Sequence, residues 1–117
     1  MYTIREILMA NQVYWVYILY CDNDSYYTGY TNDLAARYQS HIDGTGKCKY
    51  TRSFQPLNIA QCWKIFGEKS LAMKIEREIK KMSRIQKEKI IAQPSTLSTN
   101  TQIRTVPKKT RLLLSSS

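Results

Sequence analysis

The chain has 117 residues, which suits one small domain with a single hydrophobic core. Its 18 Lys and Arg outnumber its 9 Asp and Glu, and the formal net charge of +9 favours a polyanionic partner, DNA or RNA ahead of an anionic membrane surface. No apolar run approaches the roughly 18 residues that span a bilayer, which excludes a membrane-spanning helix.

Residues 1–12 lack the apolar stretch of a signal peptide, and we assign this lead-in no function. The three cysteines, Cys21, Cys48 and Cys62, form no pair or cluster with metal-ligand spacing. An odd number of thiols without such spacing is typical of a reduced protein, so we expect a cytoplasmic location.

Residues 15–29 predict a β-hairpin. The turn is Asp22-Asn23-Asp24-Ser25, whose side chains hydrogen-bond their own backbone. The second strand, residues 26–31, carries Gly29, and a glycine in a strand often marks a close approach to the backbone. Two phenols, Tyr17 and Tyr27, are expected beside each other across the hairpin. Alternation on the first strand places Tyr14, Val16, Ile18 and Tyr20 on one face and Trp15, Tyr17 and Leu19 on the other.

A helix over residues 33–42 follows, begun by a side-chain cap within Thr31-Asn32-Asp33. Its apolar positions are Leu34, Tyr38 and Ile42, and Arg37 and His41 share a second face because they are four residues apart. The next segment, residues 47–52 (KCKYTR), predicts a loop that contacts phosphate, and a solvated surface loop fits its composition about as well.

Residues 57–66 predict a central strand, because both of its faces are apolar. Strict alternation places Leu57, Ile59, Trp63 and Ile65 on one face and Ala60, Cys62 and Phe66 on the other.

An amphipathic helix is expected over residues 70–82, with Leu71, Ile75, Ile79 and Met82 directed inward and Ala72, Glu76 and Lys80 in an adjacent stripe. A capping box at Ser83-Arg84-Ile85-Gln86 begins a second helix, which ends near Ala92, before Pro94. From Lys64 to Lys89 there are nine Lys and Arg against four Glu, a basic patch. Residues 94–117 contain no acid and little periodicity, which predicts a flexible basic tail.

The order strand, strand, helix, strand, helix, helix predicts a small α/β (α+β) domain over residues 13–93, with a mainly antiparallel three-stranded sheet flanked by helices. On such a scaffold five polar residues can meet on one surface: Tyr17, Tyr27, Arg37, His41 and Glu76.

The hairpin carries a recognisable pattern. WVY at residues 15–17, followed by YTG at residues 27–29, resembles the two-part signature of the GIY-YIG nuclease superfamily, with Trp15 in place of its glycine. Further matches follow in order: Asn32, Leu34 and Arg37 resemble the N-L-x-x-R helix start, His41 lies four residues later, and Ala72 with Glu76 resembles the A-x-x-x-E context of the essential Glu. KYTR at residues 49–52 and the stretch over residues 76–84 are similar to the small bacterial branch.

This resemblance implies a DNA endonuclease of repair or recombination that uses Mg²⁺ (or Mn²⁺) and no small-molecule cofactor. Glu76 would hold the metal, Arg37 would bind the phosphate, and Tyr17 would act as general base. His41 would assist proton transfer or orient Tyr17, and Tyr27 completes the catalytic set. A single carboxylate suffices for Mg²⁺, which keeps several waters. The nucleic-acid-binding residues we expect are Lys47, Lys49, Tyr50, Arg52, Lys74, Lys80, Lys81 and Arg84.

Each residue has a plainer structural interpretation. Tyr17 and Tyr27 can be packing residues, and Glu76 can pair with Lys80 on the helix surface. Glu78 is a rival for the metal on another helix face. For the whole chain, the alternatives are a non-catalytic nucleic-acid-binding module on the same scaffold and a small RNA-associated basic protein.

Overall fold

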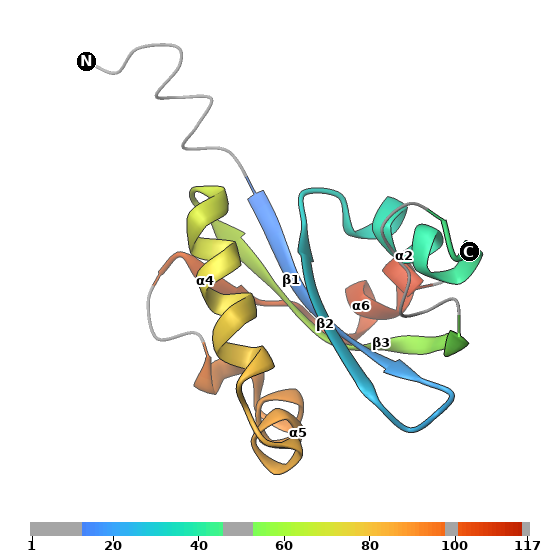
Figure 1. Cartoon of the computed structure of the whole chain (residues 1–117). Coiled ribbons are helices and arrows are strands. Elements are labelled where there is room, and N and C mark those ends of the chain that lie inside the picture. The colour runs from blue at the N-terminus through green and yellow to red at the C-terminus, as the bar shows by residue number, and fades with distance from the viewer. Residues whose placement is uncertain (1–12, 46–52, 98–100, 116–117) are drawn as a thin grey trace.

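The computed structural model describes residues 13–45, 53–97 and 101–115. An antiparallel sheet of order β2-β1-β3-β4 runs through the molecule, with helices on both faces (Figure 1). The described elements are β1 (Val13–Cys21), β2 (Tyr26–Thr31), α2 (Leu34–Asp43), β3 (Pro56–Phe66), α4 (Lys69–Lys80), α5 (Arg84–Ala92), the 3₁₀ turn η1 (Pro94–Thr96), β4 (Ile103–Thr105) and α6 (Lys108–Ser115). The predicted α+β class is confirmed, with one more strand than expected.

The hairpin forms where the sequence predicts it. Its turn is closed by backbone bonds from Cys21 N to Ser25 O and from Asp24 N to Cys21 O, at 2.9 and 3.0 Å. Asp24 has a φ of 61°, a left-handed conformation that Asp tolerates better than most residues. The β1–β2 register pairs Tyr17 with Gly29 and Leu19 with Tyr27. The two phenols therefore share a face diagonally and do not stand directly opposite each other.

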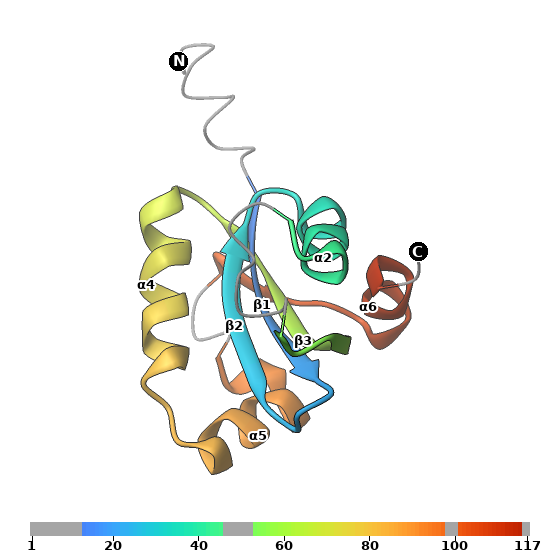
Figure 2. The ribbon, with the colours of Figure 1, turned by 45° about the vertical axis from the view of Figure 1, so that its right-hand side comes forward.

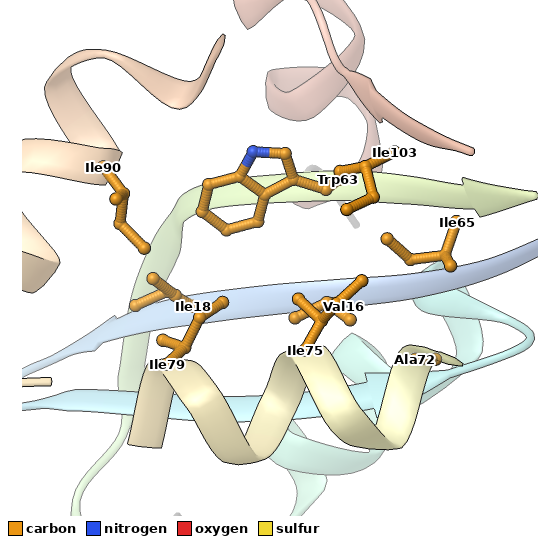
Figure 3. Close-up of a cluster of buried hydrophobic side chains, with 9 residues drawn as sticks. All are labelled: Val16, Ile18, Trp63, Ile65, Ala72, Ile75, Ile79, Ile90 and Ile103. Atoms are coloured by element: carbon orange, nitrogen blue, oxygen red, sulfur yellow. The ribbon is translucent and has the colours of Figure 1, made fainter. Parts of the chain in front are cut away.

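Side chains alternate along β1 between two hydrophobic cores, one on each face of the sheet, as predicted. The α4-side core joins Val16 and Ile18 to residues of β3, β4, α4 and α5 (Figure 3). The α2-side core joins Tyr17 and Leu19 to residues of β3, α2 and the segment that precedes α6. Because both faces of β1 and β3 are covered, these two strands lie at the centre of the fold.

A β-bulge in β3 makes the predicted alternation of that strand wrong. Ile18 pairs with Gln61 but Leu19 pairs with Ile59, so Ala60 is an extra residue on β3. Ile59 consequently lies in the α2-side core with Cys62, and not on the face of Trp63. Ala60 packs against the α4-side core instead of sharing a face with Cys62. The inserted residue therefore moves Ile59 to the face opposite the one that strict alternation predicts.

Local capping signals fix where α2 and α5 begin. The Asp33 carboxylate accepts a bond from Ala36 N at 3.2 Å and caps α2, which ends at Gly44 with a φ of 66°. The predicted capping box of α5 is present, since Ser83 Oγ accepts from Gln86 N at 3.2 Å and Gln86 Oε1 accepts from Ser83 N at 2.9 Å.

The prediction of a flexible tail after residue 93 is wrong for residues 94–97 and 101–115. Strand β4 pairs with β3, and Ile103 is buried in the α4-side core. Val106 is buried in the α2-side core. Trp63 Nε1 donates to Pro94 O at 3.0 Å, which ties η1 to the sheet. Ile103 and Val106 are isolated apolar residues, too few to give the periodic pattern that predicts a helix or strand. Their burial depends on the folded chain, in which this segment pairs with the free edge of β3.

Candidate active site

The phenol of Tyr17 lies across strand β2 at Gly29. Tyr17 is only 1% exposed and faces Gly29 in the sheet register. A Cβ on Gly29 would fall 2.5 Å from Tyr17 Oη and 2.6 Å from Cζ, closer than real side chains approach. The glycine therefore leaves room for the ring over the backbone of the edge strand. Because of it, a buried residue can present its hydroxyl at the border of the sheet.

His41 supports that phenol from α2. Its Nε2 lies 2.9 Å from Tyr17 Oη, and the side chain is 1% exposed. The Tyr27 ring lies edge-on to the imidazole, with ring centroids 5.0 Å apart. Burial, followed by the nearby positive charge of Arg37, lowers the pKa of His41 to about 4. The imidazole is therefore neutral at physiological pH, and its Nε2 can accept a hydrogen bond from the phenol when the ring carries its own proton on Nδ1.

One pocket of about 410 Å³ collects most of the predicted catalytic residues. Strand β2 runs between α2 and α4, so a pocket at this strand receives side chains from both helices (Figure 2). Four of the five predicted residues line it, and His41 lies behind Tyr17. The lining residues are Tyr14, Tyr17, Tyr27, Gly29, Tyr30, Thr31, Asn32, Arg37, Lys69 and Glu76.

Glu76 is the one carboxylate among these lining residues. Its side chain is 14% exposed and pairs with Lys80 Nζ at 3.1 Å. Its rival Glu78 is exposed and does not line the pocket. In the described part of the chain, no group of three or more His, Cys, Asp or Glu could hold a metal ion. A lone carboxylate in an open polar pocket nevertheless fits Mg²⁺, which takes few protein ligands and completes its shell with water and substrate phosphate oxygens.

The predicted nucleic-acid-binding residues separate into three groups. Lys47, Lys49, Tyr50 and Arg52 lie outside the described residues. Lys74 and Lys81 are exposed and do not line the pocket, and Lys80 pairs with Glu76.

Arg84 forms the third group, because it is engaged within the fold. Its Nη2 lies 3.0 Å from Asp24 Oδ1, and its guanidinium stacks on Tyr26 at 4.8 Å. It thus joins α5 to the hairpin turn and lies outside the pocket lining.

Sequence reasoning missed several lining residues, among them Tyr14, Tyr30 and Lys69. The two tyrosines belong to the α4 side of the sheet, where they pack against the hydrophobic core. A signal for Lys69 was present: it precedes Glu76 by seven residues, so two helical turns place both on one face.

Comparison with known proteins identifies the family of this chain. The family model described as the GIY-YIG catalytic domain matches residues 13–89. The chain belongs to the GIY-YIG family, whose catalytic domain implies nuclease activity.

Within that family it resembles small UPF0213 proteins. It is 42% identical over 86 residues to one from Cupriavidus necator, covering 74% of this chain and 91% of that protein. It is 44% identical over 81 residues to one from Oceanobacillus iheyensis, covering 69% and 92%. The solution NMR structure of a UPF0213 protein from Bacillus halodurans is 38% identical, covers 76% of this chain and 96% of that one, and superposes with a TM-score of 0.45.

The search for membrane spans adds one finding. Among the described residues, no helix has the length and apolar character that crossing a bilayer requires.

Proposed function

We propose that this protein is a Mg²⁺-dependent endonuclease that hydrolyses phosphodiester bonds in DNA. The observation that carries the proposal is the pocket at β2, which unites the Tyr17–His41 pair, Arg37 and Glu76. These groups supply three needs of phosphodiester hydrolysis: a proton acceptor for water, a cation for the phosphoryl oxygens, and a carboxylate for a metal ion.

Tyr17 acts as the proton acceptor, and His41 holds it in place. With its pKa near 4, His41 is uncharged at neutral pH and too weak a base to take the phenol proton, so its role is to orient Tyr17 through the 2.9 Å contact between its Nε2 and the phenol oxygen. Tyr17 Oη can then take a proton from the attacking water, since general base catalysis requires hydrogen-bond contact with the proton that moves. Packing against Tyr27 holds the imidazole in this orientation.

Arg37 and Glu76 face the phosphate from α2 and α4. The guanidinium of Arg37 offers a planar pair of donors to two phosphoryl oxygens. Glu76 would hold Mg²⁺, which when bound supplies Lewis-acid stabilisation of the charge that develops on the phosphate. Lys80 already neutralises the Glu76 carboxylate at 3.1 Å, so a divalent ion would replace one positive partner with another.

DNA is the partner that the charge supports. Exposed cations are Lys74 on α4, Lys81 directly after α4 and Lys89 on α5, and the whole chain carries +9. A role in DNA repair or recombination is the one that the resemblance to GIY-YIG nucleases suggests. The thiols of Cys21 and Cys62 are buried and unbridged, which supports a cytoplasmic location.

One observation favours the second candidate, a non-catalytic nucleic-acid-binding module. The Glu76–Lys80 ion pair gives this carboxylate a structural use that needs no metal. The two candidates differ in one assay, the nicking of supercoiled plasmid. An endonuclease converts the plasmid to open circles with Mg²⁺ and stops in EDTA, whereas a binding module retards the plasmid in a gel and leaves it intact in both.

A further inference from the structure

Lys69 lines the pocket from the start of α4. It is the first residue of that helix, and its side chain is exposed. Glu76 follows it by two turns on the same face, so both residues border one pocket. Arg37 and Lys69 are the two cations among the lining residues, one from α2 and one from α4.

A lysine at this position does not help the helix. The first turn of a helix carries a partial positive charge and favours Asp or Glu, but the first turn of α4 contains no acid. Glu68, the residue before it, makes no side-chain capping bond. Lys69 forms no ion pair with any residue of the chain that the structure describes, in contrast to Lys80 and Arg84. A positively charged residue that does not stabilise its own helix indicates a role in binding a ligand.

We propose that Lys69 binds a second backbone phosphate of the DNA strand, a neighbour of the phosphate that Arg37 holds. Strand β2 separates α2 from α4 (Figure 2), so Arg37 and Lys69 reach the pocket from its two sides. A nucleic-acid strand that crosses the pocket presents phosphates to both. The long lysine stem offers a mobile point charge, which suits a contact that positions the strand without reading its bases. This inference rests on the proposed function, because it assigns a substrate contact within the same site.

The test is the salt dependence of DNA affinity, measured in EDTA with a fluorescein-labelled duplex oligonucleotide. Each phosphate that a protein neutralises contributes about 0.9 to the slope of log K against log salt on duplex DNA. Lys69→Gln should lower the slope by about that amount, and Lys69→Arg should keep it. The matched control is Lys109→Gln, which removes the same charge from an exposed position on α6, on the other face of the sheet.

Two results would overturn the inference: an unchanged slope in Lys69→Gln, or an equal decrease in Lys109→Gln, which would mean that only net charge matters. The plasmid assay separates this inference from the proposed function. Loss of slope in Lys69→Gln, in a protein that nicks no plasmid with Mg²⁺, supports the phosphate contact and refutes the nuclease. Efficient nicking with an unchanged slope refutes the contact alone.

Discussion

At the residue scale, the site depends on Gly29, which has no side chain to block the Tyr17 ring. Gly29 has no positive φ, so its backbone conformation suits any residue, and the need for glycine comes from the Tyr17 ring that covers it. The ring in turn is held by His41. The position of the Tyr17 hydroxyl in the pocket therefore depends on the absence of a side chain at Gly29 of the edge strand β2, as well as on the contact with His41.

Gly29→Ala should displace the Tyr17 ring, because its new Cβ would fall 2.5 Å from Tyr17 Oη. We expect a loss of stability of about 1–3 kcal/mol, as in other overpacked sites, and loss of plasmid nicking. Urea unfolding measures the first effect. In a Tyr17→Ala background the clash is absent, so Gly29→Ala should then cost much less. Equal costs in both backgrounds would show that the ring is not the reason for the glycine.

Glu76→Gln should reduce plasmid nicking by orders of magnitude, since it removes the anion that a Mg²⁺ ion needs. DNA binding should persist or tighten, because a negative charge leaves the pocket. Folding should be almost unchanged, since Gln fits the same half-buried position and an i,i+4 ion pair on a helix contributes only about 0.3–0.5 kcal/mol. Glu78→Gln makes the same exchange outside the pocket and should cleave normally. Loss of nicking in Glu78→Gln, together with normal nicking in Glu76→Gln, would refute the assignment of Glu76 as the metal ligand.

At the scale of elements, the C-terminal segment completes the sheet. Strand β4 covers the edge of β3, and Arg111 of α6 donates to Gln61 Oε1 at 3.0 Å, beside the bulge in β3. An uncovered β3 would expose a row of unpaired backbone groups. The segment is thus part of the domain that carries the site, although it lies beyond the residues that match the family model.

Ile103→Ala should destabilise the protein by about 2–4 kcal/mol, the usual cost of truncating a buried isoleucine, because Ile103 is 7% exposed in the α4-side core. Leu112→Ala on α6 is the control, since that side chain is 55% exposed and should change stability by no more than about 0.5 kcal/mol. Urea unfolding compares the two variants. A small effect of Ile103→Ala would mean that the core does not need β4, as the prediction of a flexible tail implied.

At the scale of the whole molecule, one buried base links stability to pH. His41 is the single histidine of the chain, and its pKa of about 4 lies below the ordinary 6.5. Between these values the unfolded chain binds more protons than the folded one, so stability falls as the pH decreases through this window. Above pH 6.5 His41 is neutral in both the folded and the unfolded chain, so this loss of stability is absent.

The free energy of unfolding should therefore decrease between pH 6.5 and about 4, by up to about 3 kcal/mol from His41 at roughly 1.4 kcal/mol per pKa unit. His41→Gln lacks this titration and should show a flatter profile over the same range. Urea unfolding at a series of pH values measures both slopes. Equal slopes in the two proteins would show that His41 titrates alike in the folded and unfolded states.

The sequence alone determined the features that rest on short-range rules. Strand alternation in β1, the turn at Asp22–Ser25 and the capping box at Ser83 each follow from neighbours a few residues apart. The motifs around Tyr17, Tyr27, Arg37, His41 and Glu76 indicate the family from the sequence alone, and the match to the GIY-YIG catalytic domain confirms that family.

Only the tertiary structure decided the rest. The bulge at Ala60, the docking of Ile103, the engagement of Arg84 by Asp24 and the place of Lys69 in the pocket all join residues distant in sequence. Such contacts form because residues from separate strands and helices pack together in the two cores and along the edge of the sheet. A pattern within a short stretch of sequence does not indicate which distant residue each side chain will contact.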